Sequence, residues 1–155
     1  MKKGFTLVEL LIAISILVML LGVGLASFNS FNRRERLKQT ALTLKSTLRL
    51  AQTKAISVEK PTSGCTNFVG MRMRFTANSY SMEHECSPEG AVGATDTVTL
   101  SGGIAFSPVP ADFTFMTQTN TINISAATSI TIINGTESYI ITVSPNGSVN
   151  DEGFQ

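Results

Sequence analysis

The sequence has no lysine or arginine after Arg74, and it contains a single histidine, His84. The formal net charge of the 155-residue chain is only +1, but all 12 basic residues lie at or before Arg74, whereas most of the 11 acidic residues follow it. A charge separation of this kind directs any anionic partner to the N-terminal half. The C-terminal half is rich in Thr, Ser, Asn and Ile, which is typical of short strands joined by polar turns.

Motifs for catalysis and for metal binding are also missing. The two cysteines, Cys65 and Cys86, form neither a CxxC pair nor a Cys/His cluster, which argues against a zinc site. No nucleophile motif, glycine-rich phosphate loop or pair of carboxylates stands out, so we expect no enzymatic activity and no cofactor. His84 falls on the apolar side of its predicted strand and is interpreted as a packing residue. The Asn-Asp-Glu run at residues 150–152 lacks EF-hand spacing and is interpreted as a solvated acidic tail.

The most informative feature that is present is a long apolar run near the N-terminus. Lys2 and Lys3 precede it, and residues 5–28 would form a helix of about 36 Å, enough to cross a bilayer core. Glu9 lies inside this run, where an ionised group is costly and usually functional. A cleaved secretory signal peptide, with a mature N-terminus near Ser27, is the alternative. The length of the run and the position of Glu9 favour a retained membrane helix.

The dipeptide Gly4-Phe5, followed by Glu9, resembles the leader of type IV prepilins and of type II secretion pseudopilins. The resemblance implies that a prepilin peptidase cleaves between Gly4 and Phe5 and methylates Phe5, and that Glu9 pairs with the methylated N-terminus of a neighbouring subunit. It also implies a single-pass protein of the bacterial inner membrane, held through residues 5–28, whose head lies in the periplasm before it enters a pilus or pseudopilus. The implied partners are other pilins or pseudopilins, the prepilin peptidase and the inner-membrane assembly platform.

Beyond residue 28 the helix is predicted to continue as an amphipathic half, residues 29–60. Apolar side chains recur there in steps of three and four, the spacing of one helix face, at Leu37, Ala41, Leu44, Leu48, Ala51, Ala55 and Val58. We interpret this stripe as the face against which a sheet packs, with a coiled-coil seam as the alternative. Pro61 and Gly64 are expected to end the helix near Glu59. The predicted organisation is a leader (1–4), a transmembrane and assembly helix (5–28), the amphipathic half (29–60) and a β-rich globular head (61–155).

The β-rich region begins with a predicted hairpin, because residues 69–75 and 80–86 alternate apolar and polar side chains with the period of a strand. The polar positions carry opposite charges, Arg72 and Arg74 against Glu83 and Glu85, which can pair across strands. Cys65 and Cys86 fall near the open end of the hairpin. In an oxidising compartment they would form a disulfide bond worth about 3 kcal/mol for a loop of about twenty residues. Two free thiols in a reducing compartment are the alternative.

Further short strands are predicted in the rest of this region. The Gly/Ala/Asp stretch 90–96 is not assigned to a strand, and Asn134-Gly135 and Asn146-Gly147 are interpreted as turns. Strands are expected at residues 97–100, 104–106, 113–115, 122–124, 130–132 and 141–143. About seven or eight short strands with regular turns indicate two small antiparallel sheets. The predicted fold class is α+β, with a long N-terminal helix, transmembrane and then amphipathic, packed on antiparallel β-sheets as in pilins.

Residues 44–56, followed by many short strands, resemble the H-type pseudopilins and the FimT-like minor pilins, which usually have Ala-Arg at the position of Ala51-Gln52. Some FimT-like minor pilins bind DNA through a basic C-terminal motif. Since nothing after Arg74 is basic, we do not expect nucleic-acid binding. The predicted function is that of a minor pilin or pseudopilin, a structural subunit of a type IV pilus or type II secretion pseudopilus. A major pilin of the filament shaft and an exported β-rich binding protein are the alternatives.

Overall fold

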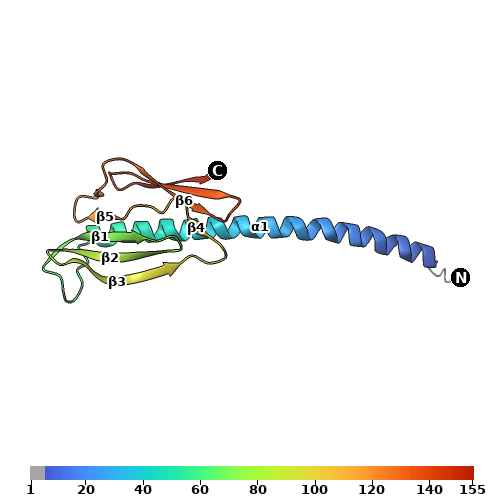
Figure 1. The fold of residues 1–155 in the computed structure, drawn as a ribbon, viewed down its shortest axis with the longest axis horizontal. Coiled ribbons are helices and arrows are strands. Elements are labelled where there is room, and N and C mark those ends of the chain that lie inside the picture. The colour runs from blue at the N-terminus through green and yellow to red at the C-terminus, as the bar shows by residue number, and fades with distance from the viewer. Residues whose placement is uncertain (1–5) are drawn as a thin grey trace. The chain divides into compact units, whose positions relative to one another are not determined.

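The computed structural model describes residues 6–155, without the side chains of residues 21–27 and 94–96. Its elements are a long helix and a series of short strands (Figure 1): α1 (Leu7–Ile56), β1 (Asn67–Phe75), β2 (Ser79–Ser87), β3 (Gly90–Thr99), β4 (Ala105–Phe106), β5 (Phe113–Met116), β6 (Thr128–Ile133), β7 (Ser138–Val143) and β8 (Val149–Phe154). The chain divides between Arg36 and Leu37 into two compact units. We call residues 37–155 the C-terminal unit and describe each unit by itself.

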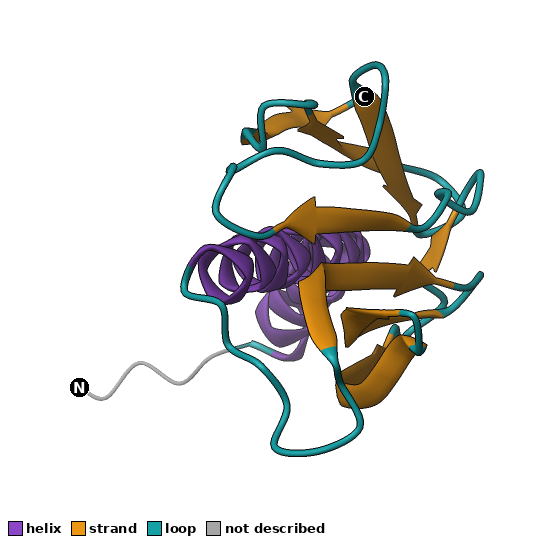
Figure 2. Ribbon diagram, turned by 90° about the vertical axis from the view of Figure 1, so that its left-hand side faces the viewer, coloured by secondary structure: helices purple, strands orange, loops and turns teal. Residues whose placement is uncertain are grey.

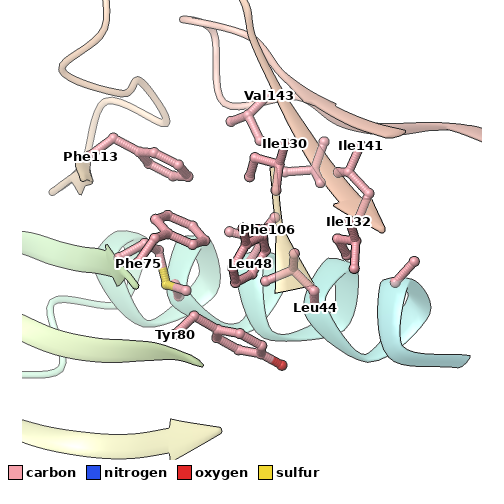
Figure 3. Packing of buried hydrophobic residues seen from close by; sticks show 14 of the residues in the cluster. Leu44, Leu48, Phe75, Tyr80, Phe106, Phe113, Ile130, Ile132, Ile141 and Val143 are labelled. Atoms are coloured by element: carbon pink, nitrogen blue, oxygen red, sulfur yellow. The ribbon is translucent and has the colours of Figure 1, made fainter. Parts of the chain in front are cut away.

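The predicted apolar stripe of α1 forms the centre of the C-terminal unit. Its first six members, from Leu37 to Ala55, are all fully buried. Strands lie beside this part of the helix in Figure 2, and Figure 3 shows Leu44 and Leu48 facing aromatic side chains of β1 and β2 and isoleucines of β6 and β7. One helix stripe therefore packs against both sheets, because the apolar period of three and four residues keeps these side chains on one face. The sheet-packing interpretation is confirmed.

The end of α1 differs from the prediction, because the helix stops at Ile56 rather than near Glu59. The Glu59 N–H donates to the Lys54 carbonyl at 3.1 Å, and the Val58 N–H donates to the Ala55 carbonyl at 3.2 Å. These two bonds are the pair that defines a Schellman cap. Val58 occupies the left-handed position of this cap, with φ +53°, where glycine is the usual residue. Val58 is therefore not the last member of the buried stripe, and its side chain is 40% exposed.

The strands form two antiparallel sheets of four strands each, with the orders β3-β2-β1-β5 and β4-β6-β7-β8. Two sheets were predicted, and the α+β fold class is confirmed. The predicted hairpin is β1 and β2, whose register places Met73 opposite Met82. A register shift between Phe68 and Gly70 changes the alternation at the start of β1. For this reason Phe68, not Val69, packs against the core.

Three parts of the strand prediction differ from the structure. The stretch 90–96, which was not assigned to a strand, is part of β3, at the edge of its sheet, where register shifts opposite Glu83 accommodate the extra residues. Residues 122–124 form no regular strand, and Ile122 makes only an isolated bridge to Phe115. Residues 150–152 are exposed, as predicted, but they do not form a tail, because they belong to β8, which pairs with β7.

Candidate functional site

Glu9, the predicted assembly residue, lies exposed in the first turn of α1. Its N–H donates to Thr6 Oγ1 at 3.3 Å, the Thr6 hydroxyl approaches Glu9 Oε2 at 3.5 Å, and the Leu10 N–H donates to the Thr6 carbonyl at 3.2 Å. Thr6 thus caps the helix through the Glu9 N–H, which is the first half of a capping box, and the Glu9 carboxylate contacts the Thr6 hydroxyl; an acid at this end also complements the helix dipole. This local role of Glu9 was not predicted, although Thr-x-x-Glu before an apolar run is its recognised signal.

Large apolar side chains cover every side of the first part of α1. They are between 55% and 79% exposed in the single chain: Leu7, Val8, Leu10, Leu11, Ile12, Ile14, Ile16, Leu17, Val18, Met19 and Leu20. The hydroxyl of Ser15 donates to the Leu11 carbonyl at 2.9 Å, so this polar group within the run is satisfied by the helix itself. A helix that is apolar all round is stable only when lipid or protein covers it. This segment therefore needs a partner or a membrane.

Several predicted features fall outside the described residues. The cleavage site Gly4/Phe5 and the methylated residue Phe5 are among them, as are the side-chain positions of residues 21–27. Within the part of the chain that the structure describes, no helix combines the length and the apolar character needed to cross a membrane. The membrane segment 5–28 stays a prediction.

Cys65 and Cys86 form the predicted disulfide bond, with 5.4 Å between their Cα atoms. The bridge ties the connection after α1 to the end of β2. On the same hairpin, Arg72 lies 3.3 Å from Glu85, and Arg74 lies 3.6 Å from Glu83, as the opposite charges predicted. The disulfide bond thus holds the open end of the hairpin, and the two ion pairs connect its strands along one face.

Asp112 is the fifth member of this charged group and was not among the predicted residues. Its carboxylate lies 3.5 Å from Arg72 and 3.8 Å from Arg74, and it accepts a hydrogen bond of 3.1 Å from the Phe75 N–H. Asp112 therefore joins the segment before β5 to the end of β1. No sequence signal identifies it, because Asp112 and Arg72 lie far apart in the chain and meet only through the pairing of β1 with β5.

Asp151 links β8 to α1 within the C-terminal unit. Its carboxylate accepts hydrogen bonds from the Lys45 ammonium and, at 3.1 Å, from the Tyr139 hydroxyl. The hydrogen bond from Lys45 and that from Tyr139 lower the pKa of Asp151 below its usual value. Burial, together with the nearby carboxylate of Asp151, raises the pKa of Tyr139. Asp151 thus holds β8 against the helix rather than forming part of a tail.

The groups that could support chemistry are dispersed. His84 is only 6% exposed, and its ring centroid lies 5.9 Å from that of Phe68, in accord with the packing role predicted for it. Among the described residues, no three His, Cys, Asp or Glu side chains come close enough to hold a metal ion.

Gln52 connects α1 to two loops. Its amide Nε2 donates to Asn120 Oδ1 at 2.6 Å and to the Gly147 carbonyl at 3.0 Å. Gly147 is buried with φ +83°, and a Cβ at this position would lie 2.3 Å from the Asn120 carbonyl oxygen. Only glycine fits here, because the backbone of the neighbouring loop occupies the space of a side chain. The side chain of residue 52 therefore fixes the turn between β7 and β8 and the loop after β5.

Two comparisons with known proteins give a match. Residues 1–25 match the family described as the prokaryotic N-terminal methylation motif. The predicted pilin-type leader is confirmed. No curated protein sequence matches this chain. The fold resembles the structure of the minor pseudopilin EpsH from the Type 2 Secretion System of Vibrio cholerae, with a TM-score of 0.54 and 14% sequence identity, over 76% of this chain and 97% of that one. The predicted resemblance to the pilins and pseudopilins is confirmed by the leader motif and by the fold.

Proposed function

We propose that this chain is a minor pilin or pseudopilin, a structural subunit of a type IV pilus or of a type II secretion pseudopilus. The observation that carries the proposal is the first part of α1, whose large apolar side chains are exposed on all sides within the residues that match a methylation motif. Such a surface has to be covered by lipid before assembly and by neighbouring helices afterwards. The likeness of the fold to a minor pseudopilin supports the same conclusion.

In this proposal residues 5–28 hold the unassembled subunit in the bacterial inner membrane, with the C-terminal unit in the periplasm. The bond between Cys65 and Cys86 supports that location, because disulfide bonds form and persist in oxidising compartments. The prepilin peptidase removes residues 1–4 and methylates Phe5. The inner-membrane platform then assembles the processed subunit with other pilins or pseudopilins.

Glu9 then has two roles that can be separated by experiment. One is local, since Glu9 and Thr6 cap α1 within the same chain. The other is intermolecular, in which the carboxylate pairs with the positive N-terminus of a neighbouring subunit. An ionised carboxylate among apolar helices needs such a partner, whereas apolar contacts alone do not fix the register of two helices.

Two substitutions distinguish these roles. Glu9→Gln keeps a side chain that can complete a capping box but removes the charge, whereas Thr6→Ala keeps the charge and removes the cap, at a cost of about 1 kcal/mol of helix stability. We expect Glu9→Gln to abolish incorporation into sheared filaments and Thr6→Ala to retain it, as measured by immunoblotting of the filament fraction. Equal loss in both variants would show that Glu9 acts only through the cap.

The processing step has its own test, the intact mass and N-terminal sequence of the protein from cells that contain a prepilin peptidase. A chain that begins at methylated Phe5 is the expected result. A chain that begins near Ser27 would instead identify a cleaved signal peptide and would overturn the proposed function. The abundance of the chain in sheared filaments then separates a minor from a major subunit.

A further inference from the structure

Two Asn-Gly turns that look alike in the sequence have different surroundings in the C-terminal unit. Asn134-Gly135 connects β6 to β7, and Asn146-Gly147 connects β7 to β8. Gly135 is exposed, with φ +90°, and nothing lies within 4 Å of the position that a Cβ would take. Its N–H donates no hydrogen bond within the described residues.

The second turn is fixed by its neighbours. The Gly147 N–H donates to the Ser144 carbonyl at 2.9 Å, and the Gly147 backbone is wedged against the Asn120 carbonyl and the Gln52 amide. Gly147 is buried, in contrast to Gly135. Movement of its backbone nitrogen therefore requires breaking a hydrogen bond and displacing a packed loop.

The two asparagine side chains also differ. Asn134 Oδ1 accepts three hydrogen bonds, at 3.3 Å from the Thr136 N–H, at 3.3 Å from the Thr136 hydroxyl and at 3.1 Å from the Glu137 N–H. Asn146 Oδ1 accepts one, from the Ser148 N–H at 3.1 Å. A carbonyl oxygen surrounded by donors is stabilised when negative charge develops on it.

We propose that Asn134 is a site of spontaneous deamidation and that the fold protects Asn146 from the same reaction. The Gly135 nitrogen loses its proton to solvent and attacks the side-chain carbonyl carbon of Asn134. A carbon–nitrogen bond forms, and the bond to the side-chain nitrogen breaks, so that ammonia leaves and a succinimide ring remains. Water then opens the ring and leaves aspartate or isoaspartate at position 134.

The geometry favours this reaction at Asn134 in two ways. The attacking nitrogen of Gly135 has no hydrogen bond to give up, whereas that of Gly147 does. The oxygen that becomes negative as the ring closes is the one that holds three donors. Loss of one hydrogen bond costs about 1 kcal/mol, and displacement of the packed turn adds to that cost. We therefore expect Asn134 to react at least about tenfold faster than Asn146, which corresponds to about 1.4 kcal/mol in activation free energy.

The product changes the surface of the turn. A neutral amide becomes a carboxylate next to the Glu137 N–H, which adds one negative charge to the part of the chain after Arg74, where the sequence contains no lysine or arginine. Isoaspartate also adds one carbon to the backbone at the tip of a tight hairpin. Both changes accumulate with the age of the molecule, because no enzyme is needed for the reaction.

The test is incubation of the full-length folded protein in detergent, at mildly alkaline pH, in water enriched in oxygen-18. Opening of the succinimide by water places one heavy oxygen in the free carboxylate of each converted residue, whether aspartate or isoaspartate. Cleavage after Glu137 by a glutamyl endopeptidase separates Asn134 from Asn146, so that mass spectrometry follows them independently. The expected result is heavy oxygen at position 134 that accumulates about tenfold faster than at position 146. Equal rates at the two positions, or no heavy oxygen at position 134, would overturn the proposal.

Two controls identify the cause of the difference. In urea with the disulfide reduced, the two positions should react at similar rates, because the difference comes from the fold. A difference that persists in the unfolded chain would show instead that the local sequence sets the rates. In the folded protein, Thr136→Val removes the hydroxyl donor to Asn134 Oδ1. It should slow the reaction about fivefold, because one hydrogen bond contributes about 1 kcal/mol to the activation free energy. An unchanged rate would contradict the role of the donors.

Discussion

Substitution of Gly147 by alanine tests how strongly the packing of one turn contributes to the stability of the C-terminal unit. The substitution has two separate costs. An L-residue in the left-handed conformation, here at φ +83°, costs about 1–2 kcal/mol. The added Cβ would also lie 2.3 Å from the Asn120 carbonyl and 2.9 Å from Gln52 Nε2, so that the loop and the glutamine must move. If Gln52 loses both of its hydrogen bonds, the further cost is about 2 kcal/mol.

The total for Gly147→Ala is therefore about 3–4 kcal/mol, a large part of the 5–15 kcal/mol by which domains are typically stable. Gly135→Ala is the matched control, because Gly135 has φ +90° and a Cβ there would meet nothing within 4 Å. It should cost only the conformational part, about 1–2 kcal/mol. At about 4 °C per kcal/mol, we expect a fall in Tm of about 12–16 °C for Gly147→Ala and about 4–8 °C for Gly135→Ala.

The assay is thermal unfolding of the full chain in detergent, followed by circular dichroism in the β-sheet region with the disulfide intact. Gln52→Ala provides a second measurement through a double-mutant cycle. Because Gly147→Ala already displaces Gln52, the double variant should be little less stable than Gly147→Ala alone. The reasoning would be refuted if the two glycine variants lost the same stability, or if the effects of Gln52→Ala and Gly147→Ala were additive.

Three further predictions follow from single contacts. Val58→Gly removes a β-branched side chain from the left-handed cap position and should raise the free energy of unfolding, measured by chemical denaturation, by about 1 kcal/mol. A lower free energy of unfolding would show that the contacts of the Val58 side chain stabilise the fold by more than its backbone strain destabilises it. The double variant Cys65→Ser and Cys86→Ser should lose about 3 kcal/mol in the same assay, whereas loss of less than about 1 kcal/mol would mean that the loop is already ordered without the bridge. The pKa of Asp151 is lower in the folded state than in the unfolded state. Its contribution to stability is therefore fully present above the unfolded pKa of about 4 and is lost as the pH falls through the folded pKa. Asp151→Asn should therefore reduce the free energy of unfolding at neutral pH by at most about 1 kcal/mol, because the pair with Lys45 is partly exposed. The variant should also show a smaller fall in Tm below about pH 4. If the curves of Tm against pH for variant and parent run parallel, this role of Asp151 is contradicted.

Much of the fold could be predicted because its signals are local. The spacing of Leu44, Leu48 and the other stripe residues depends only on the helical period, and the structure buries all six of those inside the helix. The alternation of β1 and β2 likewise depends only on the pleat of a strand, which is why the facing charges and the disulfide were predicted correctly. Even the cap formed by Thr6 and Glu9 has a local signal that the sequence analysis passed over.

Other features have no local signal. β3 and β8 contain glycine, aspartate and asparagine, which are poor strand formers, and they are strands because a neighbouring strand offers backbone hydrogen bonds. The helix end at Ile56 uses a valine in a position that sequence rules reserve for glycine. In both cases tertiary context overrides intrinsic preference.

The sequence by itself therefore determined the leader motif, the apolar run, the buried face of the amphipathic helix and the first hairpin, because each depends on residues close together in the chain. Only the tertiary structure decided which distant groups meet, as with Asp112 and its arginines or Lys45 and Asp151. The two Asn-Gly turns show the difference most clearly. Their sequences are the same, but Gly135 has open space around it and Gly147 is held by Gln52 and Asn120, because packing depends on neighbours that the local sequence does not specify.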